Sequence, residues 1–78
     1  METRIKKVMS SVLEMDTNKI DRETSTDSLE QWDSLRHMML VAALEEEFNI
    51  EFSSDDIVEM MNYPLIREII SGKINENK

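Results

Sequence analysis

The apolar residues of this chain recur at the spacing of one face of an α-helix, and few residues interrupt the pattern. Between residues 2 and 14 they fall three or four positions apart, as in an amphipathic helix. The whole chain holds one glycine and one proline, the residues that most often end helices. The apolar positions of this first segment are Ile5, Val8, Met9, Val12 and Leu13. Long helices with few breaks are therefore expected.

The length of the chain limits it to a small core. Its 78 residues are too few for more than one ordinary domain, so residues 1–78 are predicted to form a single domain. Small cores are often reinforced by disulfides or metal ions. The chain has no cysteine and one histidine, His37, which excludes a disulfide framework and thiolate metal sites. Helix packing is expected to hold the fold together, and no metal site is predicted.

The charge of the chain points to protein partners. It has 17 acidic and 9 basic residues, a net charge of −8. Such a field repels nucleic acid and anionic membranes, and it favours encounters with basic protein surfaces. No apolar run approaches the roughly 20 residues that span a bilayer, and the N-terminus has no apolar signal core. We expect a soluble, cytoplasmic monomer without nucleic-acid binding or membrane insertion.

A long polar connection follows the first helical segment. Residues 15–33 lose the helical periodicity and keep only isolated apolar residues, among them Ile20 and Leu29. A connection of this length is either disordered or pinned to the rest of the fold. We favour the second, with these two side chains pinning it to a helical bundle. Trp32 is interpreted mainly as a further packing residue of this segment, with shielding of a neighbouring site or contact with a partner as the alternatives.

Three further helices are predicted after this connection. The strongest is residues 34–48, built from good helix formers, with Asp33 as N-cap and Asn49 at its end. A capping-box-like start at residues 53–56 opens a short helix. The last helix begins near Pro64 and is expected to stop at Gly72. The predicted fold is all-α, a small four-helix bundle of three main helices and one short helix, with a long first loop, a helical core of about 2–71 and a frayed tail, 73–78.

The predicted helix of residues 34–48 has two apolar stripes, more than a small core needs. One stripe is expected to build the core and the other to meet a partner, because methionine suits surfaces that repack. Alternatively, both stripes are buried in a wide core. The core stripe consists of Leu40, Val41, Leu44 and Phe48, with His37 at its edge; the second consists of Leu35, Met38, Met39 and Ala42.

Ser34 lies directly after the predicted aspartate cap. In the first turn of a helix the backbone N–H groups are unpaired and the dipole favours an anion. A phosphodiester on this serine would be electrostatically favourable. The simpler interpretation is an ordinary helix start. A nucleophilic Ser34–His37 pair is also conceivable, but no third orienting group or oxyanion loop can be named, so catalysis is not predicted.

The segment around Ser34 resembles a known family. Asp33-Ser34-Leu35, followed by Leu40, Val41 and the run Ala43-Leu44-Glu45-Glu46-Glu47-Phe48-Asn49-Ile50, is similar to the Asp-Ser-Leu motif and following helix of acyl carrier proteins, the phosphopantetheine-binding carrier domains. The resemblance covers nearly the whole chain, from the first helix to Ile70. It implies a four-helix bundle without catalytic residues.

The resemblance also implies a covalent cofactor and a set of partners. Ser34 would receive 4'-phosphopantetheine from coenzyme A through a phosphopantetheinyl transferase, with Asp33 and Leu35 as its neighbours in the motif. Acyl-loading and acyl-processing enzymes would dock on the following helix, through the second stripe and Arg36. The thiol of the arm carries fatty acyl or polyketide intermediates as thioesters, so the protein needs no catalytic side chains.

This chain departs from the general pattern of the family in two places. Fatty-acid carriers commonly have a glycine shortly before the motif, where this chain has Glu30-Gln31-Trp32, and acidic residues early in the helix, where it has Arg36, His37 and Met39. The docking face is therefore expected to be less acidic. A specialised pathway is favoured, such as polyketide, nonribosomal peptide or surface-polysaccharide synthesis.

The sequence allows two other interpretations. The acidic loop that starts at Asp16 faintly resembles a calcium loop, but it lacks the sixth-position glycine and has Asp27 at the twelfth, so specific calcium binding is not expected. An unmodified acidic adaptor, binding a partner through the methionine stripe, is the alternative to a carrier.

Overall fold

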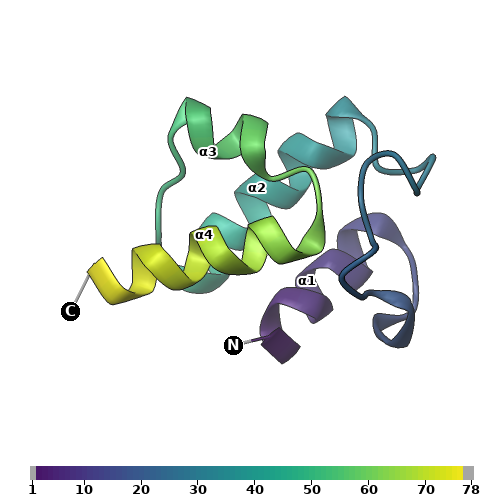
Figure 1. The fold of residues 1–78 in the computed structure, drawn as a ribbon, viewed down its shortest axis with the longest axis horizontal. Coiled ribbons are helices and arrows are strands. Elements are labelled where there is room, and N and C mark those ends of the chain that lie inside the picture. Colours follow the sequence, from purple (N-terminus) through teal and green to yellow (C-terminus); the bar gives the residue numbers. More distant parts are fainter. Residues whose placement is uncertain (1, 77–78) are drawn as a thin grey trace.

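The computed structural model describes residues 2–76 and, within them, holds four α-helices and no β-strand (Figure 1). An isolated bridge between Ser25 and Asn62 is the only extended pairing in this range. The predicted all-α fold is thus confirmed. The helices are α1 (Glu2–Leu13), α2 (Ser34–Phe48), α3 (Ser54–Glu59) and α4 (Tyr63–Glu76), with a 3-10 turn η1 (Thr17–Lys19) after α1. No helix in the described range has the length and apolar character needed to span a membrane.

The N-terminal end of α1 is bound to the C-terminal end of α2 by Arg4. Its Nε donates to Glu47 Oε2 at 2.8 Å, and a second guanidinium nitrogen donates to the Glu47 carbonyl at 2.7 Å. The guanidinium also lies over the Phe48 ring, 4.6 Å from the ring centroid. The last carbonyls of a helix lack intrahelical partners and attract cations. Arg4 thus caps α2.

The opposite ends of the same two helices are joined by Arg36. Its guanidinium donates to the Val12 carbonyl, in the last turn of α1, and to Glu14 Oε2 at 3.0 Å. Glu14 itself ends α1 with a positive φ of 55°. Because one arginine binds at each end, α1 and α2 form an antiparallel pair that is clamped twice, each time at a helix C-terminus.

The core lies between α1, α2 and α4 and is closed by the long loop. The predicted core stripe of α2 is confirmed at Leu40, Val41 and Leu44, and in part at Phe48, which is half-buried and packs against the core with Arg4 over its ring. The fully buried side chains are Ile5, Met9, Leu13, Ile20, Leu40, Leu44, Met60, Ile66 and Ile70.

The loop between α1 and α2 is pinned to the bundle, as predicted. Ile20 is buried and Leu29 packs partly against the core, while Trp32 is buried and confirms its packing role. The backbone adds two contacts with the α3–α4 junction. The Thr26 N–H donates to the Met61 carbonyl, and the Tyr63 N–H donates to the Thr24 carbonyl, both at 2.9 Å.

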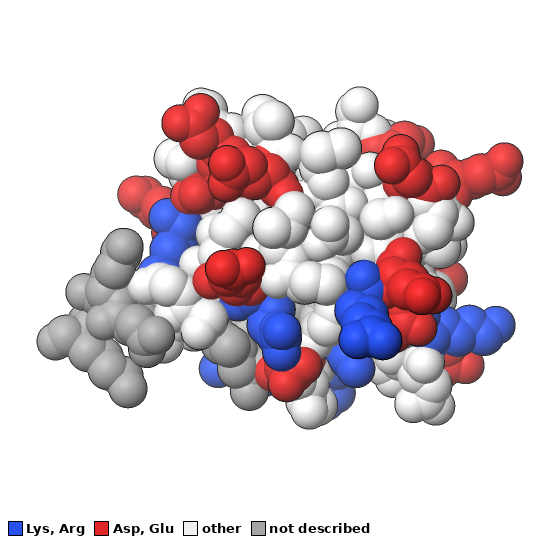
Figure 2. Space-filling view, in the orientation of Figure 1, with Lys and Arg blue, Asp and Glu red and all other residues white. Residues whose placement is uncertain are grey.

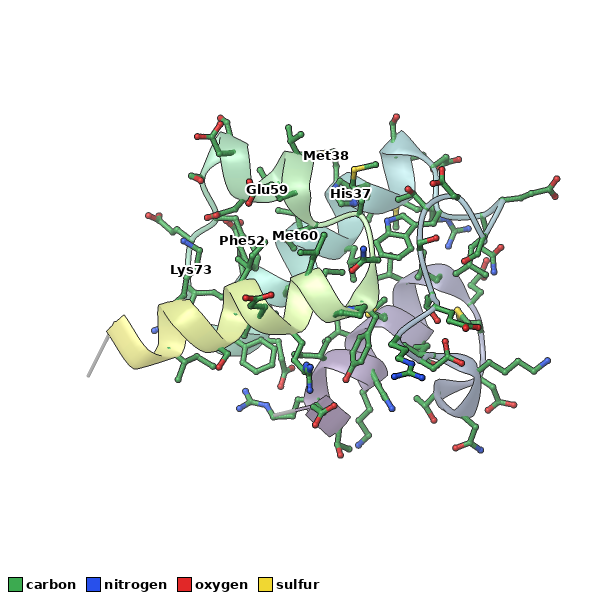
Figure 3. All side chains as sticks on the ribbon, in the orientation of Figure 1. His37, Met38, Phe52, Glu59, Met60 and Lys73 are labelled. Carbon is green, nitrogen blue, oxygen red and sulfur yellow. The ribbon has the colours of Figure 1, made fainter. Side chains whose placement is uncertain are left out.

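The predicted end of the last helix at Gly72 is wrong, because α4 continues to Glu76. A glycine inside a helix costs only about 1 kcal/mol relative to alanine, and the next turn has tertiary contacts. Lys73 Nζ lies 2.8 Å from Asp56 Oδ2 (Figure 3), and Ile74 packs partly against the core. The predicted tail is therefore helical up to residue 76, and its residues 77 and 78 lie outside the described range.

Candidate functional site

Ser34 is the first residue of α2, and its side chain is exposed. Asp33 caps the helix as predicted, because its Oδ1 accepts the Arg36 N–H at 2.9 Å. Asn49 ends the helix in the left-handed conformation, with φ of 54°. The Ser34 hydroxyl makes no hydrogen bond with the rest of residues 2–76. It is free to react and stands where a helix favours an anion.

A cleft opens beside Ser34, between the start of α2, the preceding loop and α3. Its volume is about 500 Å³, within the range of sites that hold small ligands. Its lining is mostly apolar, with Asp33 and His37 as the titratable groups. The residues that line it are Thr26, Trp32, Asp33, Ser34, His37, Ile57, Val58 and Met61. An attached group at Ser34 would therefore meet an apolar wall supplied largely by α3.

The second apolar stripe of α2 is exposed. Leu35 is 70% exposed, Met38 53% and Met39 47%, and Ala42 is exposed as well. The alternative that both stripes are buried in a wide core is thus wrong. Monomeric domains rarely leave contiguous large apolar side chains uncovered without a function, so this face is available to a partner.

Arg36 does not share this exposed face. Its guanidinium turns toward the end of α1 and binds Val12 and Glu14. The cation thus has an intramolecular role, the C-terminal capping of α1. The part of Arg36 in docking stays a prediction.

α3 adds exposed apolar residues that the sequence analysis left without a role. Val58 is 70% exposed and Met61, just after α3, is 48% exposed, and both line the cleft beside Ser34. The available signal was the run of Ile57, Val58, Met60 and Met61, because one face of so short a segment cannot bury all four side chains.

α3 is held in place by polar contacts at its N-terminal end. Ser53 and Asp56 form the predicted capping box, with N–H···O distances of 2.9 and 3.1 Å. The carboxylate of Asp56 also pairs with Lys73 of α4. The hydrogen bond from Lys73, together with that from the Ser53 N–H, lowers the pKa of Asp56. Asp56 thus stays ionised and links α3 to α4.

His37 connects three elements rather than serving Ser34. Its Nδ1 lies 3.0 Å from Trp32 Nε1, in the loop, and its Nε2 lies 2.7 Å from the Ile57 carbonyl of α3. Figure 3 shows its position on α2 beside α3. Because both ring nitrogens have partners, the conceivable Ser34–His37 pair is not formed, and His37 packs where the prediction placed it, at the edge of the core stripe.

The charge is unevenly distributed over the surface. Figure 2 shows Asp and Glu side chains on both sides of an uncharged central area along its upper edge, over α3 and over the segment before α2. Lys and Arg lie mainly in the lower half, over α1 and α4. α2 carries no acidic residue in its first turn, as predicted, but its neighbours supply carboxylates. No group of three or more potential metal ligands occurs within the described part of the chain.

A helical bundle with an exposed serine at a capped helix start, beside an apolar cleft, has the arrangement of a carrier domain. Comparison with known proteins gives the same class. The family model described as "Phosphopantetheine attachment site" matches residues 3–71. An acyl carrier protein of Buchnera aphidicola subsp. Schizaphis graminum (strain Sg) is 38% identical over 79 aligned residues, which cover all of this chain and 95% of that protein.

The chain belongs to the acyl carrier protein family. It is therefore a carrier rather than an enzyme, it bears covalently attached 4'-phosphopantetheine, and it interacts with biosynthetic enzymes. The chemistry lies in the thiol of the arm, which the protein presents. Family membership also excludes the alternative of an unmodified adaptor.

Asp33→Ala is expected to lower the free energy of unfolding by about 0.5 to 2 kcal/mol, because the Arg36 N–H loses its cap. Modification of the neighbouring serine should also become slower. Urea unfolding followed by circular dichroism measures the first effect, and timed mass spectrometry the second. Asp27→Ala, in the exposed loop, is the control; if it destabilises the protein as much as Asp33→Ala, capping is not the cause.

Proposed function

We propose that Ser34 is the attachment residue of the phosphopantetheine arm, and that the chain presents acyl thioesters to the enzymes of a specialised biosynthetic pathway. The observation that carries the proposal is the exposed Ser34 hydroxyl at the start of a capped helix. Attachment requires a transferase to reach the hydroxyl, which displaces the nucleotide part of coenzyme A and leaves a phosphodiester. The unpaired N–H groups and the dipole of α2 favour that anion.

The surroundings of Ser34 support the same role. The arm leaves the helix at the mouth of the cleft, where Val58 and Met61 offer apolar surface to its root or to a short acyl group. The thiol at its tip remains free to pass between enzymes. The cleft thus shelters part of the cargo, and the exposed position of the serine permits delivery.

The exposed face of α2 is the proposed docking surface for partner enzymes. Leu35, Met38, Met39 and Ala42 form it, and flexible methionine side chains repack against different apolar partners. Acidic residues lie on both sides of the uncharged area along the upper edge of Figure 2, which favours partners whose apolar pocket has a basic rim. A transferase and the acyl-loading and acyl-processing enzymes must all use this end of the molecule, because the arm starts there.

The proposal of a specialised pathway depends on the first turns of α2. Arg36, His37 and Met39 occupy positions at which fatty-acid-type carriers usually have acidic residues. Partners that read carboxylates at these positions would find a cation and two other side chains instead. Selection between partners is expected to appear mainly in association rates, which depend on charge.

Arg36→Glu is expected to slow loading by the cognate enzyme and to improve interaction with fatty-acid-type partners, since it introduces the missing carboxylate. Initial loading rates at rising salt concentration measure this, because screening reduces an electrostatic effect. Because the substitution also removes the cap of α1, circular dichroism is used first to verify that the helices are retained. Glu14→Gln is the matched control: it removes the ion pair with Arg36 but keeps the cation. Unchanged loading rates with both classes of partner would show that Arg36 does not contribute to partner selection.

The proposed attachment is tested by incubating the wild-type chain with coenzyme A and a broad-specificity phosphopantetheinyl transferase. The intact mass should rise by one phosphopantetheine unit, and peptide mapping should place it on Ser34. Modification of a different residue, or none with several such transferases, would overturn the proposal.

A further inference from the structure

A continuous chain of hydrogen bonds crosses the wall of the cleft. It runs from Trp32 in the loop to His37 on α2 and on to the Ile57 carbonyl of α3. The indole is buried, with 3% of its surface exposed, and the imidazole is half-buried. All three residues line the cleft beside Ser34. The side chain of His37 is therefore the part that joins the fixed start of α2 to α3.

The two hydrogen bonds define the protonation state of His37. An indole N–H can only donate, so Nδ1 of His37 must accept the bond from Trp32. A neutral imidazole with an accepting Nδ1 carries its proton on Nε2, which then donates to the Ile57 carbonyl. A second proton would place an N–H on Nδ1, directed at the N–H of Trp32. Only the neutral Nε2–H form satisfies both partners.

α3 is weakly anchored between its two ends. None of its residues is fully buried, and only Ile57 packs partly against the core, while Met60, directly after the helix, is buried. Its N-terminal end is bound through Asp56 and Lys73, and the junction after it through Met61 and Thr26. The Ile57 carbonyl lies between these anchors, in the last turn, where carbonyls lack intrahelical partners. The Nε2–H of His37 supplies the missing donor and holds the middle of α3 against α2.

We propose that His37 is a positioning residue that, in its neutral form, fixes α3 against the start of α2 and so sets the width of the cleft beside Ser34. The importance of the cleft for the arm rests on the proposed function, but the contact itself does not. Loss of the bond to Ile57 loosens the middle of α3, while the anchors at Asp56 and Met61 keep the movement local. The width of the cleft thus depends on a single side chain.

The test compares hydrogen exchange and NMR signals of the unmodified wild-type chain and of His37→Phe at pH 7.5. The ¹⁵N shifts of His37 in the wild type should report the Nε2–H form. In His37→Phe the protection of the Trp32 indole N–H and of the α3 amides should be roughly two- to tenfold lower than in the wild type, as expected for a lost hydrogen bond. A proton on Nδ1 in the wild type, or α3 protection that is equal in the two proteins, would overturn the proposal.

Three variants distinguish positioning from simple packing. His37→Gln keeps one donor and one acceptor, so it should keep most of the protection of α3. His37→Phe keeps a ring but neither bond, and should show low protection of α3. Trp32→Phe removes the donor to Nδ1, so the ¹⁵N shifts of His37 should show more of the Nδ1–H form than in the wild type. Protection in His37→Phe equal to that of the wild type at pH 7.5 would contradict the proposed role.

The outcome is independent of the attachment of the arm. Ser34 modification is measured by mass on a separate portion of the same wild-type protein. Normal modification of the wild type, together with α3 protection that is unchanged in His37→Phe, overturns the positioning role of His37 alone. A loss of α3 protection in His37→Phe, together with a wild type that never acquires the arm, overturns the attachment at Ser34 alone.

Discussion

Ser34→Ala is expected to abolish attachment of the phosphopantetheine arm and to leave the helix content of the protein unchanged. The hydroxyl is the only group that the side chain loses, and it makes no hydrogen bond within the described residues. Alanine is the best helix former, and Asp33 still caps the helix. Intact mass after incubation with coenzyme A and a transferase measures the modification, and circular dichroism measures the helix content.

Other serines of the chain serve as internal controls for this loss. The Ser28 hydroxyl binds within its own turn, and Ser53 caps α3. Ser54 begins α3 and is exposed, but it does not line the cleft beside Ser34. Ser34→Ala protein that still gains the arm, on any of these serines, would show that the attachment residue has been misassigned.

Leu44→Ala is expected to lower the free energy of unfolding by about 2 to 5 kcal/mol, because it removes a fully buried side chain and leaves a cavity. That loss is a large part of the stability of a domain this small. Met39→Ala, on the exposed face of the same helix, should cost much less. Denaturant unfolding of both variants measures the difference.

The comparison between these two variants tests the division of α2 into a core face and an exposed face. Both substitutions end in alanine and lie within one continuous helix, so helix propensity contributes little to the difference. Phe48→Ala is expected to fall between them, because its ring is half-buried beneath Arg4. If Met39→Ala destabilises the protein as much as Leu44→Ala does, the two-face description is wrong.

The features that were predicted well are those with local signals. The boundaries of α2 follow from Asp33 at one end and Asn49 at the other, and the capping box of α3 is read directly from residues 53–56. The end of α4 was predicted wrongly because the local signal, Gly72, is weaker than contacts made by the next turn. The contact of Lys73 with Asp56 joins residues that are distant in the sequence, and no spacing rule reveals it.

The candidate site shows the same difference between features with local sequence signals and features fixed by distant contacts. The exposed second stripe of α2 followed from helical periodicity, because more apolar residues were present than one face needs. The roles of Arg36 and His37 were missed, since their partners are backbone carbonyls on other helices, at Val12 and Ile57. Every residue has a carbonyl, so the sequence gives no sign of which one a distant side chain will bind.

The two arginine clamps on α1 and α2 distinguish the residues that the fold requires from those that can be substituted without loss of the fold. Arg4 and Arg36 fix the frame without using any residue of α3. α3 has no fully buried residue, and only its Ile57 packs partly against the core. Substitutions at exposed positions of α3, such as Val58, can therefore reshape the cleft wall while the other helices maintain the fold. Adaptation to a new cargo would require few changes, and these would be concentrated in the shortest helix.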